Sequence, residues 1–110
     1  MIYIFNSLIV PCDFNVNSEF TVYLKKISKD QAVEILKNNN FVSAVGHQST
    51  AEVLTAILGV HIPMNRIAVR MGKGDVGIHF FLKQRLPEGA VLGEEELKKL
   101  DFDFILSEIT

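Results

Sequence analysis

Residues 41–59 read FVSAVGHQSTAEVLTAILG, and their pattern predicts a strand followed directly by a helix. Residues 41–45 are apolar and rich in strand-forming side chains, which predicts a strand. Ser49 and Glu52 have the spacing of a capping box that would open a helix over 51–58, and Gly59 would end it. With a further strand ending at Met71, the stretch predicts a strand–helix–strand unit over 41–71.

Other strands are predicted where apolar residues alternate with polar ones or run together. These segments are 1–5, 20–24, 66–71, 76–82 and 102–109. The segments 66–71 and 76–82 flank the turn residues Gly72-Lys73-Gly74-Asp75, so we predict that they form a β-hairpin. Pro87 ends the second of these strands, because proline lacks the backbone donor of a sheet ladder.

Two more helices are predicted. Ser28 and Gln31 have capping-box spacing ahead of an amphipathic segment that the asparagines at 38–40 terminate. Acidic residues followed by Lys98 and Lys99 predict a third helix over about 94–100. The order of the elements predicts an α/β single domain over 1–110, with a mixed β-sheet of about five to six strands flanked by short helices.

Composition limits the class of protein. A chain of 110 residues with 48% hydrophobic content is long enough for one stable core, which excludes intrinsic disorder. The single cysteine, Cys12, excludes an intramolecular disulfide framework and favours a cytoplasmic setting, the host cytoplasm if the chain is viral. The N-terminus has no basic lead, and no apolar run approaches about 18 residues, so we expect no export and no membrane span.

The charge is unevenly distributed along the chain. The formal net charge is −2, which argues against a protein that coats long nucleic acid. Residues 66–85 nevertheless hold five basic residues and one acid, whereas 86–110 hold two lysines and seven acids. A local cationic stretch suits a small phosphate-bearing ligand, because field focusing needs only a few charges. A solvated hairpin face explains the same charges equally well.

The junction Gly46-His47-Gln48-Ser49-Thr50 is the most informative candidate site. It lies between a predicted strand end and a predicted helix N-terminus, where free N–H groups and the helix dipole attract anions. The hydroxyls of Ser49 and Thr50 could add donors. The plainer alternative is that Ser49 is only the helix cap and that Gly46-His47 is an ordinary tight connection.

A second candidate site follows the predicted hairpin, in Gln84-Arg85-Leu86-Pro87-Glu88-Gly89. The Arg85 guanidinium could hold a phosphate while Glu88 orients a neighbour, or the two could form a weak surface ion pair. His61 and His79 lack metal-ligand spacing with His47, so we expect no metal site. His79 is expected to be a packed or rim residue and Cys12 a small buried hydrophobe.

Four motifs together resemble those of the viral anti-CRISPR ring nucleases, which dismantle the cyclic oligoadenylate signals of type III CRISPR systems. The motifs span the chain and are Asn6-Ser7, the junction 46–50, Asn65-Arg66 and the segment 84–89. The resemblance implies a homodimer that binds cyclic tetra-adenylate and cleaves it with neither metal nor cofactor. One departure is Ile9, because some relatives carry serine there, and Ser7 would then have to supply the hydroxyl contact.

The resemblance also assigns roles to residues. It implies His47 as the catalytic residue with Arg85 and Glu88 beside it, and a set of ligand contacts made up of Asn6, Ser7, Gln48, Ser49, Thr50, Arg66 and Gln84. The chemistry is consistent with these residue types, because RNA carries its own nucleophile in the 2′-hydroxyl and needs only alignment, charge neutralisation and a proton for the leaving oxygen. The expected products are linear di-adenylates with 2′,3′-cyclic phosphate ends.

The same residues are also consistent with a second function, a non-catalytic cyclic-nucleotide sponge or regulatory binding domain. Such a protein needs hydrogen-bond donors but no general acid. The imidazole of His47 in the loop before the helix is therefore the feature that separates the two functions.

Overall fold

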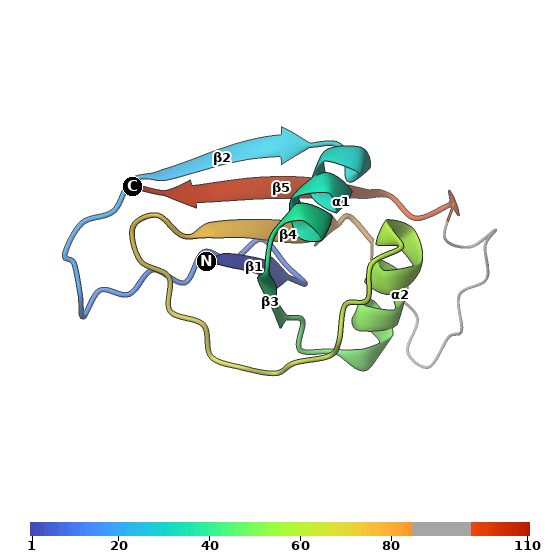
Figure 1. Cartoon of the computed structure of the whole chain (residues 1–110), viewed down its shortest axis with the longest axis horizontal. Helices are drawn as coiled ribbons and strands as arrows, with labels where there is room; N and C mark the ends of the chain where they lie inside the picture. The colour runs from blue at the N-terminus through green and yellow to red at the C-terminus, as the bar shows by residue number, and fades with distance from the viewer. Residues whose placement is uncertain (85–97) are drawn as a thin grey trace.

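Residues 1–84 and 98–110 are described by the computed structural model, and they form a mixed five-stranded sheet with two helices on one face (Figure 1). The elements are β1 (Ile2–Phe5), β2 (Val22–Ile27), α1 (Lys29–Asn38), β3 (Phe41–Ala44), α2 (Gln48–Leu58), β4 (Val76–Leu82) and β5 (Phe102–Ile109). The predicted α/β domain with a mixed sheet is confirmed. Residues 94–97 of the predicted third helix lie outside the described residues.

The strand order is β2-β5-β4-β1-β3. β1 pairs in parallel with both β3 and β4, whereas β5 is antiparallel to β4 and to β2. The carboxyl ends of β1, β3 and β4 consequently lie at the same edge of the sheet. Both chain termini lie toward the opposite edge (Figure 1), where Val76 N–H donates to the Met1 carbonyl and Gly74 N–H to the Ile109 carbonyl.

The predicted hairpin between 66–71 and 76–82 is wrong. Both edges of β4 are occupied, by β1 and by β5, so β4 has no free edge for a hairpin partner. The backbone of 66–71 is instead bound at its end by the loop after β1, where Met71 N–H donates to the Pro11 carbonyl and Asp13 N–H donates to the Met71 carbonyl. The strand–helix–strand unit is real, but its second strand is β4 rather than 66–71.

The helix signals are confirmed in part. Ser28 and Gln31 form the predicted capping box, with Gln31 N–H donating to Ser28 Oγ at 3.1 Å and Ser28 N–H to Gln31 Oε1 at 2.9 Å. Gly59 ends α2 in the left-handed conformation at φ 66°, which glycine adopts without steric cost. No helix in residues 1–84 and 98–110 is long and apolar enough to cross a membrane.

The core lies between the sheet and the two helices. It joins Ile4, Phe80 and Phe104 of the central strands to Leu36 of α1 and Leu54 of α2, all essentially inaccessible to solvent. The Phe80 ring lies 5.8 Å from the Phe104 ring, and aromatic pairs at this spacing add to the burial of apolar area. This core fixes the sheet against α2, and so fixes the helix N-terminus relative to the strand ends.

The edge strand β2 departs from prediction. It begins at Val22 rather than at residue 20 and extends to Ile27, and Val22 and Leu24 are exposed rather than half-buried. The alternation of side chains is present, but β2 has a single neighbour, β5, and the face that holds Val22 and Leu24 is the face away from the helices. Alternation of apolar and polar residues predicts a strand, but it does not show whether that strand has a neighbouring strand on each side.

A small buried polar cluster lies on the side of the sheet opposite the helices. His79 and Ser107 are fully buried there, and His79 Nε2 lies 2.8 Å from Ser107 Oγ. Gly77 faces Ser107 across the β4–β5 ladder, and a Cβ at Gly77 would lie 2.6 Å from Ser107 Oγ and 2.7 Å from His79 Nε2. The absence of a side chain at residue 77 therefore makes room for this pair.

Gly77→Ala should destabilise the fold by about 1–3 kcal/mol, because the added methyl overpacks a buried polar contact that cannot move aside. The measurement is the free energy of unfolding in denaturant. Gly72→Ala is the matched control, since a Cβ at residue 72 meets nothing within 4 Å. Equal stability of the two variants would show that the pair has room to shift.

Candidate functional site

The candidate site forms where β1 and β3 end. Asn6 and Ser7 directly follow β1, and Gly46 and His47 follow β3 after Val45. Because the two strands are parallel neighbours in register, with Phe5 opposite Ala44, these two segments emerge side by side. Asn6 Oδ1 accepts a hydrogen bond from Gly46 N–H at 3.5 Å, so the two ends are joined by a long contact. The sheet thus brings together two motifs that are 40 residues apart.

His47 is the N-cap residue of α2. Its backbone is extended, at φ −130° and ψ 129°, and its side chain makes no capping hydrogen bond. Its side chain is exposed, so the imidazole is accessible to a ligand. The first turn of α2 contains no acidic residue, which leaves the positive end of the helix dipole without a local counter-charge.

The predicted Ser49–Glu52 capping box is wrong. The helix begins at Gln48, so Ser49 lies inside the first turn and cannot act as its cap. Glu52 instead accepts a hydrogen bond from Gln48 Nε2 at 3.1 Å. Ser49 is therefore not the cap of α2, which contradicts that part of the plainer alternative. Gln48 and Ser49 are exposed and Thr50 is half-buried beside the helix start.

Arg66 joins the site through the loop that follows α2. Asn65 anchors this loop along the outer edge of β3, because its N–H donates to the Val45 carbonyl and its Nδ2 to the Ser43 carbonyl, both at 2.7 Å. Arg66 Nε then donates to the Gly46 carbonyl at 3.3 Å. The exposed guanidinium is held next to the peptide that precedes His47. The Asn65-Arg66 motif therefore belongs to the same site as the junction 46–50.

Gln84 lies apart from the strand-end residues. Its Oε1 accepts from Asp101 N–H at 3.2 Å, at the start of β5. Phe5 pairs with His79 in the register of β1 and β4, so Gln84 lies five residues further along than the partner of Phe5, roughly 16 Å at strand spacing. Arg85 and Glu88 lie outside the described residues.

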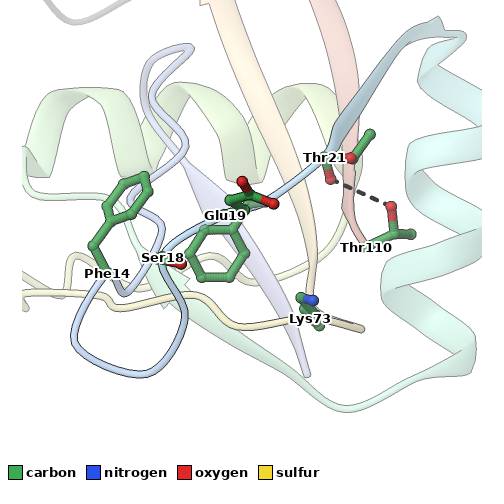
Figure 2. A pocket seen from close by; sticks show the side chains of 7 residues that line it. Phe14, Ser18, Glu19, Thr21, Lys73 and Thr110 are labelled. Atoms are coloured by element: carbon green, nitrogen blue, oxygen red, sulfur yellow. Dashed lines mark hydrogen bonds between the residues drawn. The ribbon is translucent and has the colours of Figure 1, made fainter.

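The cationic stretch 66–85 is not a single patch in the described residues. Arg66 lies at the site, whereas Lys83 makes ion pairs with Asp103 at 3.2 Å and Asp101 at 3.7 Å. Lys73 lies at the far edge of the sheet, beside a hollow of about 540 Å³ that Phe14, Ser18 and Thr110 help to line (Figure 2). The charges are dispersed because 66–71 runs past the sheet instead of forming a hairpin with β4.

Two hollows adjoin the candidate site. One, of about 220 Å³, lies at the end of β1 and is lined by Phe5, Asn6, Ser7, Ile9, Pro11, Ala44, Ile67 and Val69. A larger one, of about 550 Å³, runs beside α2 and is lined by Gln48, Ala51, Glu52, Thr55, Ala56, His61, Ile62, Pro63 and Met64. Ile9, at which the chain departs from the resemblance described above, is exposed at the smaller hollow and so lies near the site.

Two further chemistry-bearing side chains, His79 and Cys12, are predicted from the sequence to be packing residues. His79 is indeed packed, at 0% exposure, while Cys12 is only half-buried and pairs with Met71 in an isolated bridge. What sequence reasoning missed is that His79 Nδ1 reaches the Ser7 carbonyl at 3.1 Å, at the candidate site. No group of three or more His, Cys, Asp or Glu side chains gathers in the part of the chain that the structure describes.

The fold and the site together define an α/β protein with an exposed histidine at the junction of parallel strand ends and a helix N-terminus. The model of the STIV B116-like family matches residues 2–104, and the chain belongs to this family. The solved structure of B116 of Sulfolobus turreted icosahedral virus superposes with a TM-score of 0.77 at 24% identity, covering 97% of each chain. That likeness confirms the fold.

Sequence relatives come from archaeal viruses and from a bacterium. Uncharacterized protein 26 of Sulfolobus islandicus filamentous virus is 40% identical over 110 residues, covering 99% of this chain and 92% of the relative. ORF117 of Acidianus two-tailed virus is 39% identical over 106 residues, covering 94% and 88%. YddF of Bacillus subtilis is 36% identical over 84 residues, covering 74% and 78%. The chain therefore belongs to a viral protein family that also reaches a cellular genome.

Burial of His79 should make folding stability depend on pH. Desolvation lowers the pKa of His79 below its ordinary value of about 6.5, although the hydrogen bond to Ser7 acts in the opposite direction. The groups in contact with the ring are a carbonyl, a hydroxyl and a phenyl ring, all uncharged. The unfolded chain therefore takes up this proton at a higher pH than the folded chain does.

Stability from this residue should be complete above about pH 6.5 and fall as the pH drops below that value, by at most about 1.4 kcal/mol per pH unit for one proton. Denaturant unfolding of the wild type and of His79→Gln between pH 5 and 8 measures the difference. Parallel curves for the two proteins would contradict the assignment.

Proposed function

We propose that this protein is a metal-independent ring nuclease that cleaves cyclic tetra-adenylate at a homodimer interface. The observation that carries the proposal is His47, an exposed imidazole at the N-cap of α2 whose side chain is not used for capping. An ordinary helix would favour serine, threonine, aspartate or asparagine at this position. A histidine that leaves the helix start uncapped is explained by a role toward a ligand.

The chemistry follows from the groups around His47. The 2′-hydroxyl of one nucleotide attacks the adjacent phosphorus, its proton passes to solvent, and the P–O bond to the 5′ oxygen breaks. Protonated His47 gives its proton to the departing 5′ oxygen, which leaves a 2′,3′-cyclic phosphate on one product end and a hydroxyl on the other. Free N–H groups of the first turn of α2 are suited to the negative charge on the phosphorane.

Other residues would hold the ring in place. Arg66 lies beside the peptide of Gly46 and supplies positive charge next to His47. The segments that follow β1 and β3 would offer further hydrogen-bonding groups to phosphate and ribose, namely those of Asn6, Ser7, Gln48, Ser49 and Thr50. The resemblance to ring nucleases implies Arg85 and Glu88 beside His47, where the guanidinium of Arg85 would neutralise the phosphorane.

A homodimer solves two problems that a single chain leaves open. Of the two hollows at the site, the one at the end of β1, about 220 Å³, is below the size of a site for a drug-sized molecule, and the one beside α2, about 550 Å³, is of that size, whereas cyclic tetra-adenylate has four nucleotides. A ring of four identical nucleotides also admits a two-fold axis, which only a symmetric dimer can match. Gln84, whose side chain contacts the start of β5, could contact the ring from the partner.

The sheet offers a surface for this second copy. On the face opposite the helices, Leu24 of β2 is 49% exposed and Phe81 of β4 is 40% exposed, with Val22 also exposed. Val22 and Leu24 lie together on β2, and Phe81 lies across β5 and four residues further along β4 than the level of Leu24. Exposed apolar side chains on a sheet face are suited to association. The hollow at the Asn6-Ser7 corner is on the same face of the sheet, so this is the face we assign to the contact between two copies.

His47→Ala should retain binding of cyclic tetra-adenylate and lower its cleavage rate by about 10²- to 10⁴-fold, the usual effect of losing one general acid. Product formation is followed by chromatography, with binding measured separately by calorimetry. His61→Ala is the matched control, because His61 is exposed beside α2 but lies outside the proposed catalytic group.

The same assay tests the alternative functions. Cleavage should persist in excess chelator, and complete inactivation with rescue by Mg²⁺ or Mn²⁺ would refute the metal-independent mechanism. Tight binding with no cleavage by the wild type would instead identify a cyclic-nucleotide sponge.

Two chains should bind one ring. Calorimetry gives the stoichiometry and light scattering gives the mass of the complex. Leu24→Lys should weaken both dimerisation and ring binding, because it puts a charge on the proposed interface. Tyr23→Lys, on the opposite face of β2 and facing Glu108, is the matched control and should change neither. Full cleavage by a monomer that binds one ring by itself would contradict the model.

A further inference from the structure

His79 lies at the centre of the sheet and takes no part in the chemistry proposed above. Its side chain is completely buried in β4, opposite Phe5 at the end of β1. Burying an imidazole costs free energy unless its ring nitrogens find partners, and an apolar side chain could fill the same space without that requirement. A histidine here therefore calls for an explanation beyond packing.

Each ring nitrogen of His79 contacts a different part of the molecule. Nδ1 lies 3.1 Å from the carbonyl oxygen of Ser7, and Nε2 lies 2.8 Å from Ser107 Oγ. A carbonyl oxygen can only accept, so Nδ1 has the ring proton and donates it, and the Ser107 hydroxyl donates to Nε2. The Phe5 ring stacks on the imidazole, with centroids 4.9 Å apart and planes 7° from parallel, which limits its orientation.

The Ser7 contact connects His79 to the candidate site. Ser7 follows Asn6, and Asn6 Oδ1 is the acceptor for Gly46 N–H, one residue before His47. At 3.5 Å this hydrogen bond is at the outer limit for a direct contact, so it depends strongly on where the Asn6-Ser7 corner is held. Within the described contacts, His79 is the side chain that ties the Ser7 carbonyl to the rigid centre of the sheet.

We propose that His79 is a positioning residue: by donating from Nδ1 to the Ser7 carbonyl, it holds the Asn6-Ser7 corner so that Asn6 can orient Gly46 and His47. The hydrogen bond with Ser107 stabilises the fold, and the hydrogen bond with Ser7 positions the residues of the candidate site. The kinetic consequence rests on the proposed function, whereas the structural consequence does not.

Two substitutions separate the two contacts. The amide nitrogen of an asparagine side chain occupies roughly the position of Nδ1 of histidine, and that of a glutamine side chain roughly the position of Nε2. His79→Asn can therefore keep the bond to Ser7, and His79→Gln can keep the bond to Ser107. Ser107→Ala is the control, because it removes the stabilising contact and leaves the one to Ser7.

The first measurement uses ligand-free protein and needs no activity. Amide exchange by NMR should be faster at Gly46 in His79→Gln, by about fivefold for the loss of one ordinary hydrogen bond, and close to wild type in His79→Asn and Ser107→Ala. Nitrogen chemical shifts of the wild-type ring should show the proton on Nδ1. A proton on Nε2, or unchanged Gly46 exchange in folded His79→Gln, would overturn the proposal.

The second measurement is cleavage of cyclic tetra-adenylate. His79→Gln should lower kcat by up to about 100-fold, as misplacement of a reacting group by 1 Å can do, with little change in KM, and His79→Asn should recover most of the rate. A loss of kcat in Ser107→Ala as large as that in His79→Gln would show a merely structural role. If the wild type does not cleave the ring, the proposed function fails while the exchange data still decide whether His79 holds the corner.

Discussion

β1 is only four residues long, yet it makes parallel pairs on both sides, with β3 and with β4. Parallel pairing places the carboxyl ends of neighbouring strands at one edge of the sheet, and here it sets the Asn6-Ser7 corner beside the start of α2. The core between sheet and helices holds α2 in place, because Leu54 packs against the same cluster as Ile4. If β1 shifted by one residue along β3, Asn6 would no longer face Gly46, and the alternation of side chains would turn Ile4 out of the core.

The two faces of the sheet differ in the side chains that they bury. The face toward α1 and α2 is apolar and supplies most of the buried area. The opposite face contains a buried histidine and serine, a glycine that makes room for them, and exposed apolar side chains on β2 and β4. A polar group in the interior is tolerated when its partners are present, and His79 has one partner on each ring nitrogen. This arrangement connects the central strand of the sheet, β4, to the corner where ligand chemistry is proposed.

Membership in the STIV B116-like family and the match to the B116 fold establish what kind of molecule this is. The uncapped start of α2 with its exposed imidazole, and the motifs that resemble those of ring nucleases, are what support catalysis as a proposal. Family membership is compatible with cleavage and with simple binding of a cyclic nucleotide, since both need the same donors. Cleavage also needs a group that gives a proton to the leaving oxygen, and His47 is the proposed donor. His47 therefore distinguishes cleavage from simple binding.

Local signals in the sequence were sufficient to predict whether most segments form a helix or a strand. The Ser28–Gln31 capping box, the end of α2 at Gly59 and the strand character of β1, β3, β4 and β5 are properties of adjacent residues, and they were predicted from those residues alone. The motifs around His47 and Arg66 were also recognisable in the sequence, although their contact was not. The tertiary structure decided which strands β4 pairs with, because a strand has only two edges. In β4 these edges are occupied by β1 and β5, so residues 66–71 cannot pair with it. It also decided that α2 starts at Gln48 and that His79 reaches Ser7, since both depend on how the sheet and helices pack and not on the spacing of residues along the chain.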